Sequence, residues 1–295
     1  MKLSGKRVVL IAGPTASGKS ALALRLAEAH GGEIINADSM QVYDVLDILT
    51  ARPAADDLSR VPHRLYGHVF PGSRYSVGRW LDEATAAIAA AKAAGRLPIL
   101  VGGTGLYFKA LTEGLVEIPE IPAGIRQRLR DRATVEGAPA LHAELERRDP
   151  EMAARLVPSE PQRLVRALEV LEATGRSLAD WQRDPTTPVV ALEETDHVVL
   201  APERPVLHAR IEARFAQMMA AGALEEVRAL VALGLDADLP AMKAIGVRPL
   251  AALLAGDIDE GEAVRRAIVE TRRYAKRQMT WFNGQMADWP RFAPL

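Results

Sequence analysis

The stretch Gly13, Pro14, Thr15, Ala16, Ser17, Gly18, Lys19, Ser20 has the residue types and spacing that suit a phosphate-binding loop. It fits the pattern G-x-x-x-x-G-K-[ST], whose glycines let the backbone wrap around an anion while helix N-terminal amides supply positive potential. Lys19 adds a positive charge, and the Ser20 hydroxyl can reach a magnesium ion. An apolar run precedes the pattern and helical spacing follows it, so we predict a phosphate site rather than a glycine turn without a ligand.

Asp38 and Thr104 each follow another apolar run, 33–37 and 97–103. In an open parallel sheet, ligands lie beyond the carboxyl ends of the strands, so both residues are expected near the loop. Asp38 could act as a general base or hold metal-bound water, and the alternative is an ordinary turn or helix-capping aspartate. Thr104 follows glycines where ATP-hydrolysing proteins usually have a magnesium-binding acid, which counts against ATP hydrolysis. A plain strand-to-helix turn is the alternative for Thr104.

Basic and aromatic residues alternate in the C-terminal segment 271–282. Such a mixture suits phosphate contacts and base stacking, although a solvated basic face over a buried aromatic stripe would look the same. Further arginines stand at 126, 128, 130, 132, 163 and 166. Because the chain has a net charge of −1, acidic segments elsewhere balance them, and this clustering of basic residues favours a nucleic-acid-binding face. Arg214 lies in an amphipathic stretch, 207–215, and could neutralise a leaving phosphate or simply pair with a surface acid.

Composition excludes several classes of protein. The 295 residues are 48% hydrophobic and 25% charged, as in an ordinary soluble domain. There is no cysteine, which rules out disulfides and thiolate chemistry and fits a reducing, cytoplasmic setting. The six histidines show no metal-ligand spacing. No run approaches the ~18 apolar residues of a membrane span, and the N-terminal run is too short for a signal peptide.

The hydrophobic pattern predicts strands at 7–13, 33–37, 97–103 and 195–202, separated by helices at 20–30 and 76–94. Residues 115–190 show only helical spacing, with an N-cap predicted at Ser159 and a stop at Gly175 before the chain returns to a strand. We therefore predict an α/β fold, a P-loop NTPase-like parallel sheet flanked by helices. The core would comprise 1–115 and 195–295, and the helical insertion 116–194.

Taken together, these stretches resemble the tRNA dimethylallyltransferases, or tRNA isopentenyltransferases, in their bacterial form. The motifs run in order over nearly the whole chain: GPTASGKS, INADSMQVY, PHRL, YSVGRW, GRLPILVGGTGLYFKAL, PQRLVRALEV, RIEARF, AIG and TRRYAKRQMTWF. The resemblance implies transfer of a dimethylallyl group from dimethylallyl diphosphate to N6 of the adenosine just 3′ to the anticodon. Diphosphate leaves, and no ATP is needed.

The resemblance also implies roles for single residues. The loop from Gly13 to Ser20 would cradle the diphosphate, with Mg²⁺ near Ser20. Asp38 would accept a proton from the adenine amine, Thr104 would position Asp38 or the diphosphate, and Arg214 would steady the departing diphosphate. Partners would be the tRNA anticodon stem-loop and dimethylallyl diphosphate, with no membrane and a monomeric protein. The positions that match tRNA-contacting segments are Asp38, Ser39, Met40, Gln41, Thr104, Arg126, Gln162, Arg163, Leu164, Val165, Arg166, Lys243, Arg248, Lys276, Arg277, Gln278 and Trp281.

The chain departs from the family pattern at Leu49, Arg52, Gly67, Val247 and Asn283. None of these is a predicted catalytic position. Three other functions remain open at this stage: a small-molecule or nucleotide kinase, an isopentenyltransferase that acts on free adenine nucleotides, and a non-catalytic nucleic-acid-binding protein. ATP turnover without tRNA would favour the first, and transfer to AMP would favour the second.

Overall fold

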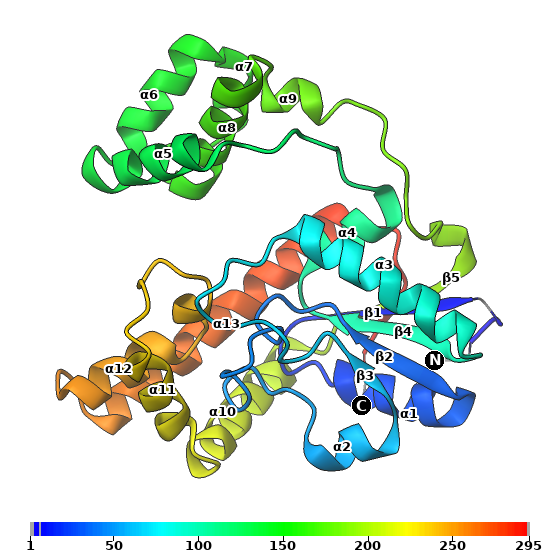
Figure 1. Cartoon of the computed structure of the whole chain (residues 1–295). Coiled ribbons are helices and arrows are strands. Elements are labelled where there is room, and N and C mark those ends of the chain that lie inside the picture. Colours follow the sequence, from blue (N-terminus) through cyan, green and yellow to red (C-terminus); the bar gives the residue numbers. More distant parts are fainter. Residues whose placement is uncertain (1–2, 6, 294–295) are drawn as a thin grey trace. The chain divides into compact units, whose positions relative to one another are not determined.

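The computed structural model describes residues 3–5 and 7–293 (Figure 1). Within these residues the strands form one sheet, ordered β3-β2-β4-β1-β5-β6, and every pairing is parallel. The strands are β1 (Val8–Ala12), β2 (Gly32–Asn36), β3 (His63–Arg64), β4 (Leu97–Gly102), β5 (Thr195–Leu200) and β6 (Arg291–Phe292). The predicted parallel sheet is confirmed. Strands β3 and β6 were not predicted, because two residues are too few to show a period.

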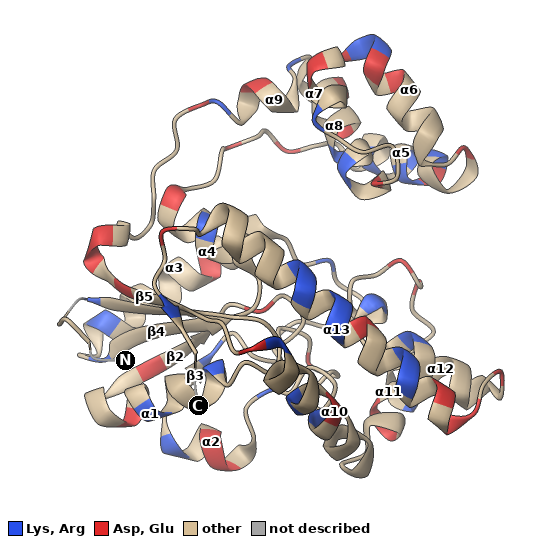
Figure 2. Ribbon diagram, turned by 180° about the vertical axis from the view of Figure 1, so that it is seen from behind, with Lys and Arg blue, Asp and Glu red and all other residues tan. Residues whose placement is uncertain are grey.

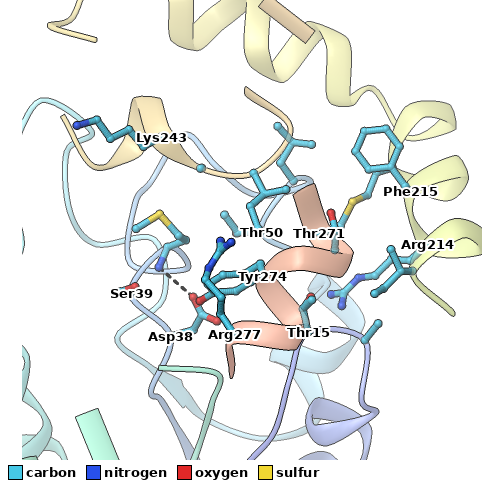
Figure 3. Close-up of a pocket in the computed structure, with 17 residues that line it drawn as sticks. Thr15, Asp38, Ser39, Thr50, Arg214, Phe215, Lys243, Thr271, Tyr274 and Arg277 are labelled. Carbon is cyan, nitrogen blue, oxygen red and sulfur yellow. Dashed lines mark hydrogen bonds between the residues drawn. The ribbon is translucent and has the colours of Figure 1, made fainter. Parts of the chain in front are cut away.

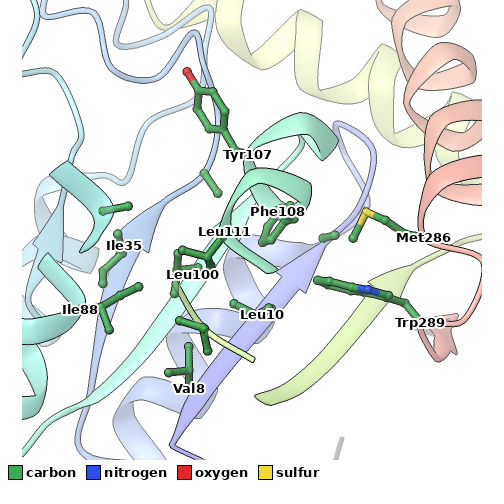
Figure 4. Packing of buried hydrophobic residues seen from close by; sticks show 14 of the residues in the cluster. Val8, Leu10, Ile35, Ile88, Leu100, Tyr107, Phe108, Leu111, Met286 and Trp289 are labelled. Atoms are coloured by element: carbon green, nitrogen blue, oxygen red, sulfur yellow. The ribbon is translucent and has the colours of Figure 1, made fainter. Parts of the chain in front are cut away.

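Helices cover both faces of the central strands, which explains their unbroken apolar runs. Val8 and Leu10 of β1 face α3 (Val77–Ala93) and α4 (Gly105–Glu113), in a core that includes Phe108 (Figure 4). The alternate residues Val9 and Ile11 pack against α1 (Lys19–His30). Because β1, β2 and β4 run parallel as neighbours, the loops that follow them emerge at one edge of the sheet.

The C-terminal helices build a second core on the same unit. They are α10 (Arg204–Ala220), α11 (Ala223–Ala232), α12 (Val247–Ala255) and α13 (Glu260–Gln285), with the short 3₁₀ turn η2 (Ala241–Lys243). Another 3₁₀ turn, η1 (Leu192–Glu194), precedes β5, and its Leu192 packs against the sheet core. Val42, Tyr43 and Leu46 from the loop after β2 are buried in this core. A further short helix, α2 (Ala55–Arg60), follows that loop. The segment 40–50 is thus packed against helices far away in sequence.

Residues 114–187 form a separate compact unit, and 1–113 with 188–295 form the other. The smaller unit has its own core, which includes Leu129, Leu141 and Leu168. Its helices are α5 (Ala123–Val135), α6 (Ala138–Arg148), α7 (Pro150–Ala154), α8 (Pro161–Thr174) and α9 (Leu178–Trp181). The sequence placed the second boundary at 194. The structure places it earlier because the amides of Val189 and Val190 donate to the Leu111 carbonyl at the end of α4, 2.9 and 3.2 Å away.

The two ends of α8 show how helix signals compare with the structure. Gly175 follows the helix with φ of 68°, as the predicted stop requires. Ser159 was predicted as the N-cap and is not. Glu160 takes that position without a side-chain cap, since Pro161 fixes the first helical residue. No helix in the described ranges is both long enough and apolar enough to cross a bilayer.

Candidate active site

The loop after β1 is shaped to bind an anion. Gly18 has φ of 87° and Ala16 has φ of 60°, so the chain winds tightly before α1 begins at Lys19. No side chain caps the start of α1, which leaves its first amides for a ligand. A Cβ on Gly13 would lie 2.8 Å from Ser17 Oγ and 3.1 Å from Leu200 Cβ, so glycine is needed there. These features fit the phosphate-binding loop predicted from sequence.

The Lys19 side chain folds back over the phosphate-binding loop. Its Nζ donates to the Pro14 carbonyl oxygen at 3.2 Å. Burial disfavours the charged amine and lowers the pKa of Lys19 to about 8, while the Asp38 carboxylate opposes this and the positive charge of Arg214 adds to it. Burial also lowers the pKa of Arg214, against the attraction of Asp38. A polyanion bound in this site would offset the electrostatic repulsion between Lys19 and Arg214.

Two adjoining cavities meet at Asp38. The smaller, about 130 Å³, is polar and is lined by residues 15–21 together with Asp38, Gln41, Thr50 and Arg214. The larger, about 270 Å³, shares Thr15, Ala16, Asp38, Thr50 and Arg214 with it (Figure 3). It adds the apolar side chains of Leu49, Ile211, Phe215, Met218 and Ile245. An anionic subsite and an apolar subsite therefore adjoin, as a ligand with a short apolar chain on a phosphate group requires.

Asp38 is held by its own strand end. Its amide donates to Asn36 Oδ1 at 2.8 Å, and Asn36 Nδ2 donates to the Asp38 carbonyl at 2.9 Å. The carboxylate oxygen Oδ1 accepts from the Met40 amide at 2.9 Å (Figure 3). Among the described residues, the other oxygen, Oδ2, has no hydrogen-bond donor. This carboxylate therefore combines a fixed orientation with one oxygen available to a ligand.

Thr104 contacts the loop that carries Asp38 and not the phosphate cavity. Its Oγ1 accepts from the Ser39 amide at 3.0 Å and lies 3.3 Å from Ser39 Oγ. Its own amide donates to the Ala37 carbonyl at 3.2 Å. Thr104 lines neither cavity. Of the two roles considered for it, positioning of the residues around Asp38 is the one that these contacts support.

Gln278 of α13 joins two of the site's loops. Its Oε1 accepts from the Thr15 amide at 2.9 Å, and its Nε2 donates to the Gly103 carbonyl at 2.9 Å. The side chain is only 5% exposed. A Cβ on Gly103 would come within 2.2 Å of Gln278 Nε2, so this glycine makes room for the amide. The sequence predicted Gln278 as a tRNA contact, but the structure commits both ends of its amide to protein.

The negative charge of Asp38 acts on three tyrosines, of which only Tyr274 stands in a segment to which the sequence assigned a role. Burial raises the pKa of Tyr66, Tyr107 and Tyr274, and the nearby Asp38 carboxylate raises each further. The phenols therefore stay protonated at neutral pH. Tyr66 and Tyr107 are distant from Asp38 in sequence, so no local pattern indicated that they lie near it.

The C-terminal segment divides between the core and the surface. Phe282 is fully buried beside the sheet, so at this position the alternative of a buried aromatic residue under a basic face holds. Arg272 pairs with Glu212 of α10. By contrast, Arg273, Lys276 and Arg277 are exposed and make no ion pair within the described ranges. These three residues, with Arg248, form what we call the basic strip. Figure 2 shows several Lys and Arg positions, in blue, along α13.

The basic strip adjoins the apolar cavity. Arg277 lines that cavity, a neighbouring groove with Lys276 and Trp281, and a third hollow with Lys243 and Arg248. The guanidinium of Arg277 lies 5.6 Å from the centre of the Tyr274 ring, in cation–π range. Lys243 is paired with Asp238 at 2.8 Å. Predicted contact residues from two separate segments are thus brought together around Asp38.

In the smaller unit, the predicted contact residues differ in availability. Arg163 pairs with Glu160 at 3.2 Å, and Arg166 pairs with Glu169 at 3.6 Å. Leu164 and Val165 are buried in the unit's core, so their side chains are not presented to a partner. Arg126 and Gln162 have no ion pair or side-chain hydrogen bond within the described ranges. The neighbouring cations Arg128 and Arg132 are neutralised by acids of the same unit.

The residues present also fit a magnesium ion that shares its ligands with a phosphate. Ser20 is exposed at the start of α1, and both it and Asp38 line the polar cavity. No group of three or more histidine, cysteine or acidic side chains suited to a metal occurs in the part of the chain that the structure describes. Mg²⁺ commonly takes one or two protein oxygens and fills the rest with phosphate oxygens and water. A hydroxyl and one carboxylate match that pattern.

Known proteins share both the sequence and the fold of this chain. The IPP transferase model matches residues 41–285, and the isopentenyl transferase model matches 6–68. The tRNA dimethylallyltransferase of Rhizobium etli is 55% identical over 99% of both chains, and that of Rhizobium meliloti is 56% identical over 96% of this chain and 94% of its own.

Two solved structures extend the likeness. The tRNA isopentenylpyrophosphate transferase of Bacillus halodurans aligns with a TM-score of 0.69 at 36% identity, over 98% of this chain and 90% of its own. A eukaryotic dimethylallyltransferase, described as acting on tRNA, aligns with a TM-score of 0.83 at 27% identity, over 96% of this chain and 71% of its own. With a family model that spans most of the chain and relatives above half identity, the chain belongs to the IPP transferase family of tRNA dimethylallyltransferases.

Proposed function

We propose that this chain transfers a dimethylallyl group from dimethylallyl diphosphate to N6 of the adenosine next to the anticodon, on its 3′ side, in tRNA. The observation that carries the proposal is the pair of adjoining cavities, one polar and one apolar, that meet at Asp38. The polar cavity accepts the diphosphate and the apolar cavity accepts the prenyl chain. The carbon between them then lies beside the carboxylate.

The diphosphate is bound as a leaving group. The amides at the start of α1, the amine of Lys19 and the guanidinium of Arg214 all face the polar cavity. Negative charge grows on the bridging oxygen as the bond to carbon breaks, and fixed cations and amides lower the energy of that state. Ser20 is the residue that would hold Mg²⁺, which would supply further neutralisation of the diphosphate when bound.

Asp38 acts on the acceptor. The exocyclic amine of adenine is a weak nucleophile, because its lone pair is delocalised into the ring, so it needs a positioned base. The N6–C1 bond forms as the C1–O bond breaks, the electron pair leaves with diphosphate, and the amine proton passes to Asp38 Oδ2. Oδ1 keeps its bond to the Met40 amide and holds the carboxylate in place.

The tRNA would reach this site as an extruded base with its flanking phosphates on the protein surface. A stacked base must leave its neighbours at a cost of about a few kcal/mol before N6 can reach Asp38. The basic strip and Trp281 offer charge and an aromatic face beside the cavity. Arg126, Gln162, Arg163 and Arg166 of the smaller unit are proposed as further contacts. A monomer suffices, since one chain supplies all these residues, and we place the protein in the cytoplasm.

Labelled dimethylallyl diphosphate tests the proposal directly. The protein is incubated with the donor and, separately, with unmodified tRNA, an anticodon stem-loop, AMP or ADP. We expect label in the tRNA and the stem-loop. Label in AMP but not in tRNA would replace the proposal with the nucleotide-prenylating activity, and ATP turnover without any acceptor would favour a kinase.

A further inference from the structure

We propose that Leu49, fixed in position by Glu226, limits the donor to a five-carbon prenyl chain. This inference rests on the proposed function and adds a determinant of donor size to it. Leu49 lines the apolar cavity but not the polar one, so it faces the prenyl chain and not the phosphates.

Leu49 lines the apolar cavity and packs against the backbone at Gly246. A Cβ placed on Gly246 would lie 2.9 Å from Leu49 Cδ2 and 3.5 Å from Phe215 Cε2. The ends of the Leu49 and Phe215 side chains therefore both press on the backbone at Gly246, where φ is 93°. A glycine at this point lets the two side chains approach the turn before α12, and both side chains line the cavity.

Glu226 holds the segment that carries Leu49. Its carboxylate accepts three consecutive backbone amides, from Asp47 at 2.7 Å, Ile48 at 2.6 Å and Leu49 at 2.9 Å. Charge-assisted bonds of this kind are stronger than neutral ones. From the other side, Gln41 Nε2 donates to the carbonyls of Thr50 and Ala51, both at 2.9 Å. The wall is thus fixed at residues 47–49 and at residues 50–51.

A fixed wall discriminates by size better than a mobile one. Close-packed interiors yield little to an added group, and a single methylene in an apolar pocket changes kcat/KM by about 10- to 200-fold. A ten-carbon chain on the same diphosphate would have to displace the Leu49 side chain. The backbone of residues 47–49 cannot shift to allow this without breaking its hydrogen bonds to Glu226. Leu49 therefore limits the length of the prenyl chain that the apolar cavity accepts, and Glu226 is the positioning residue that holds Leu49 in place.

Leu49→Ala tests the size limit with dimethylallyl and geranyl diphosphates as competing donors on an anticodon stem-loop. We expect the ratio of kcat/KM for geranyl over dimethylallyl diphosphate to rise at least about tenfold. Leu58→Ala removes the same atoms from an exposed site on α2 and should leave the ratio unchanged. An unchanged ratio in Leu49→Ala, with dimethylallyl transfer intact, overturns the inference alone. A wild-type protein that transfers no dimethylallyl group overturns the proposed function instead.

Glu226→Gln tests the anchoring, since an amide oxygen cannot accept all three amides as a carboxylate does. We expect a raised KM for dimethylallyl diphosphate, a smaller change in kcat, and a partial rise in the geranyl ratio. Glu225→Gln changes the neighbouring exposed acid on the same helix and is the matched control. A lower melting temperature with an unchanged donor ratio would reduce Glu226 to a structural role and contradict the proposal.

Discussion

Lys19, Asp38 and Arg214 place two positive charges and one negative charge around a single small cavity. In the proposed reaction, Lys19 and Arg214 stabilise the diphosphate leaving group. Asp38 acts on the adenine amine, so the cations and the carboxylate act on different substrates. Their mutual distances are maintained by backbone contacts: the Pro14 carbonyl for Lys19 and the Met40 amide for Asp38. Changes at these positions should therefore separate donor binding from the chemical step.

Asp38→Asn should reduce kcat by about 10²- to 10⁴-fold, the usual contribution of a positioned general base. The amide keeps the size of the carboxylate, and its oxygen can still accept from the Met40 amide. We expect tRNA affinity to change little. Single-turnover transfer and a separate tRNA-binding assay check this, and near-normal turnover would remove Asp38 from the role of base.

Lys19 should make donor binding sensitive to pH. Its pKa is lowered to about 8 by burial. A bound diphosphate favours the charged amine and raises this pKa, so binding takes up a proton above about pH 8. KM for the donor should then be flat below that pH and rise by up to about tenfold per unit above it. The phosphates themselves are ionised well below this range.

Lys19 affects the stability of the fold in the opposite direction as the pH rises. Between about pH 8 and the ordinary lysine value of 10.5, the unfolded chain binds more protons at Lys19 than the folded one. Its contribution to stability therefore rises with pH over the window in which donor affinity falls. Lys19→Arg keeps its charge throughout and should give a flat KM profile up to pH 9.5. A rising profile in that variant would assign the pH dependence to another group.

The sequence could predict residues whose role follows from a strand end, and it missed those that depend on tertiary packing. The loop 13–20 and Asp38 come directly after buried strands, so their place was predictable from the pattern alone. Tyr66 and Tyr107 gather around Asp38 from separate segments. Glu226 reaches the segment 47–49 across 177–179 residues of sequence. No local periodicity contains such a pairing.

At the scale of elements, α13 has two functions on two faces. Gln278 and Phe282 point inward, to the site's loops and to the sheet. Arg273, Lys276 and Arg277 point outward. The sequence showed that the helix is basic and aromatic, but it could not assign Gln278 to the inner face, because a polar residue in a basic segment gives no sign of burial. The helix thus links the donor site to the proposed RNA surface.

Arg277→Ala should weaken tRNA binding and lower the slope of log K against log[salt] by about 0.7–0.9, the value for one lost phosphate contact. Arg265→Ala is the matched control. It lies on the same helix but pairs with Glu262 at 2.7 Å, and it should leave the slope unchanged. Binding isotherms at several salt concentrations make the measurement. A weaker affinity with the full slope would assign Arg277 to base stacking instead.

Gln278→Leu should destabilise the loops of the site, although Gln278 itself is bonded to protein at both ends of its amide and not to a substrate. The Thr15 amide and the Gly103 carbonyl would lose their partner, at a cost of about 1–3 kcal/mol. Because Thr15 lines both cavities, KM for the donor should rise with the loss of stability. Thermal unfolding and donor titration would show this together. A normal KM in a destabilised protein would mean that the loop keeps its shape without the amide.

At the scale of the whole molecule, the chain is built as two units with separate cores. The insertion was visible in sequence as a stretch without strands, but its exit was placed seven residues late, at 194 rather than 187. Residues 188–190 carry no strand period of their own. They belong to the larger unit through two hydrogen bonds to Leu111 and the burial of Val190 beside the sheet.

Replacing 114–187 with a short glycine-serine linker should therefore leave the larger unit folded. Its ends are already held together, since the Leu111 carbonyl accepts from the amides of Val189 and Val190. The donor site lies wholly in that unit, so affinity for dimethylallyl diphosphate should stay within about threefold of the full chain.

Affinity for tRNA should fall by at least about tenfold, because two linked contact surfaces bind more tightly than one. Calorimetric titration with each ligand tests both halves. If tRNA binding survives intact, the proposed contacts of the smaller unit are wrong. If donor binding is lost from a folded core, then the smaller unit contributes to the donor site, and the assignment of that site to the larger unit alone is wrong.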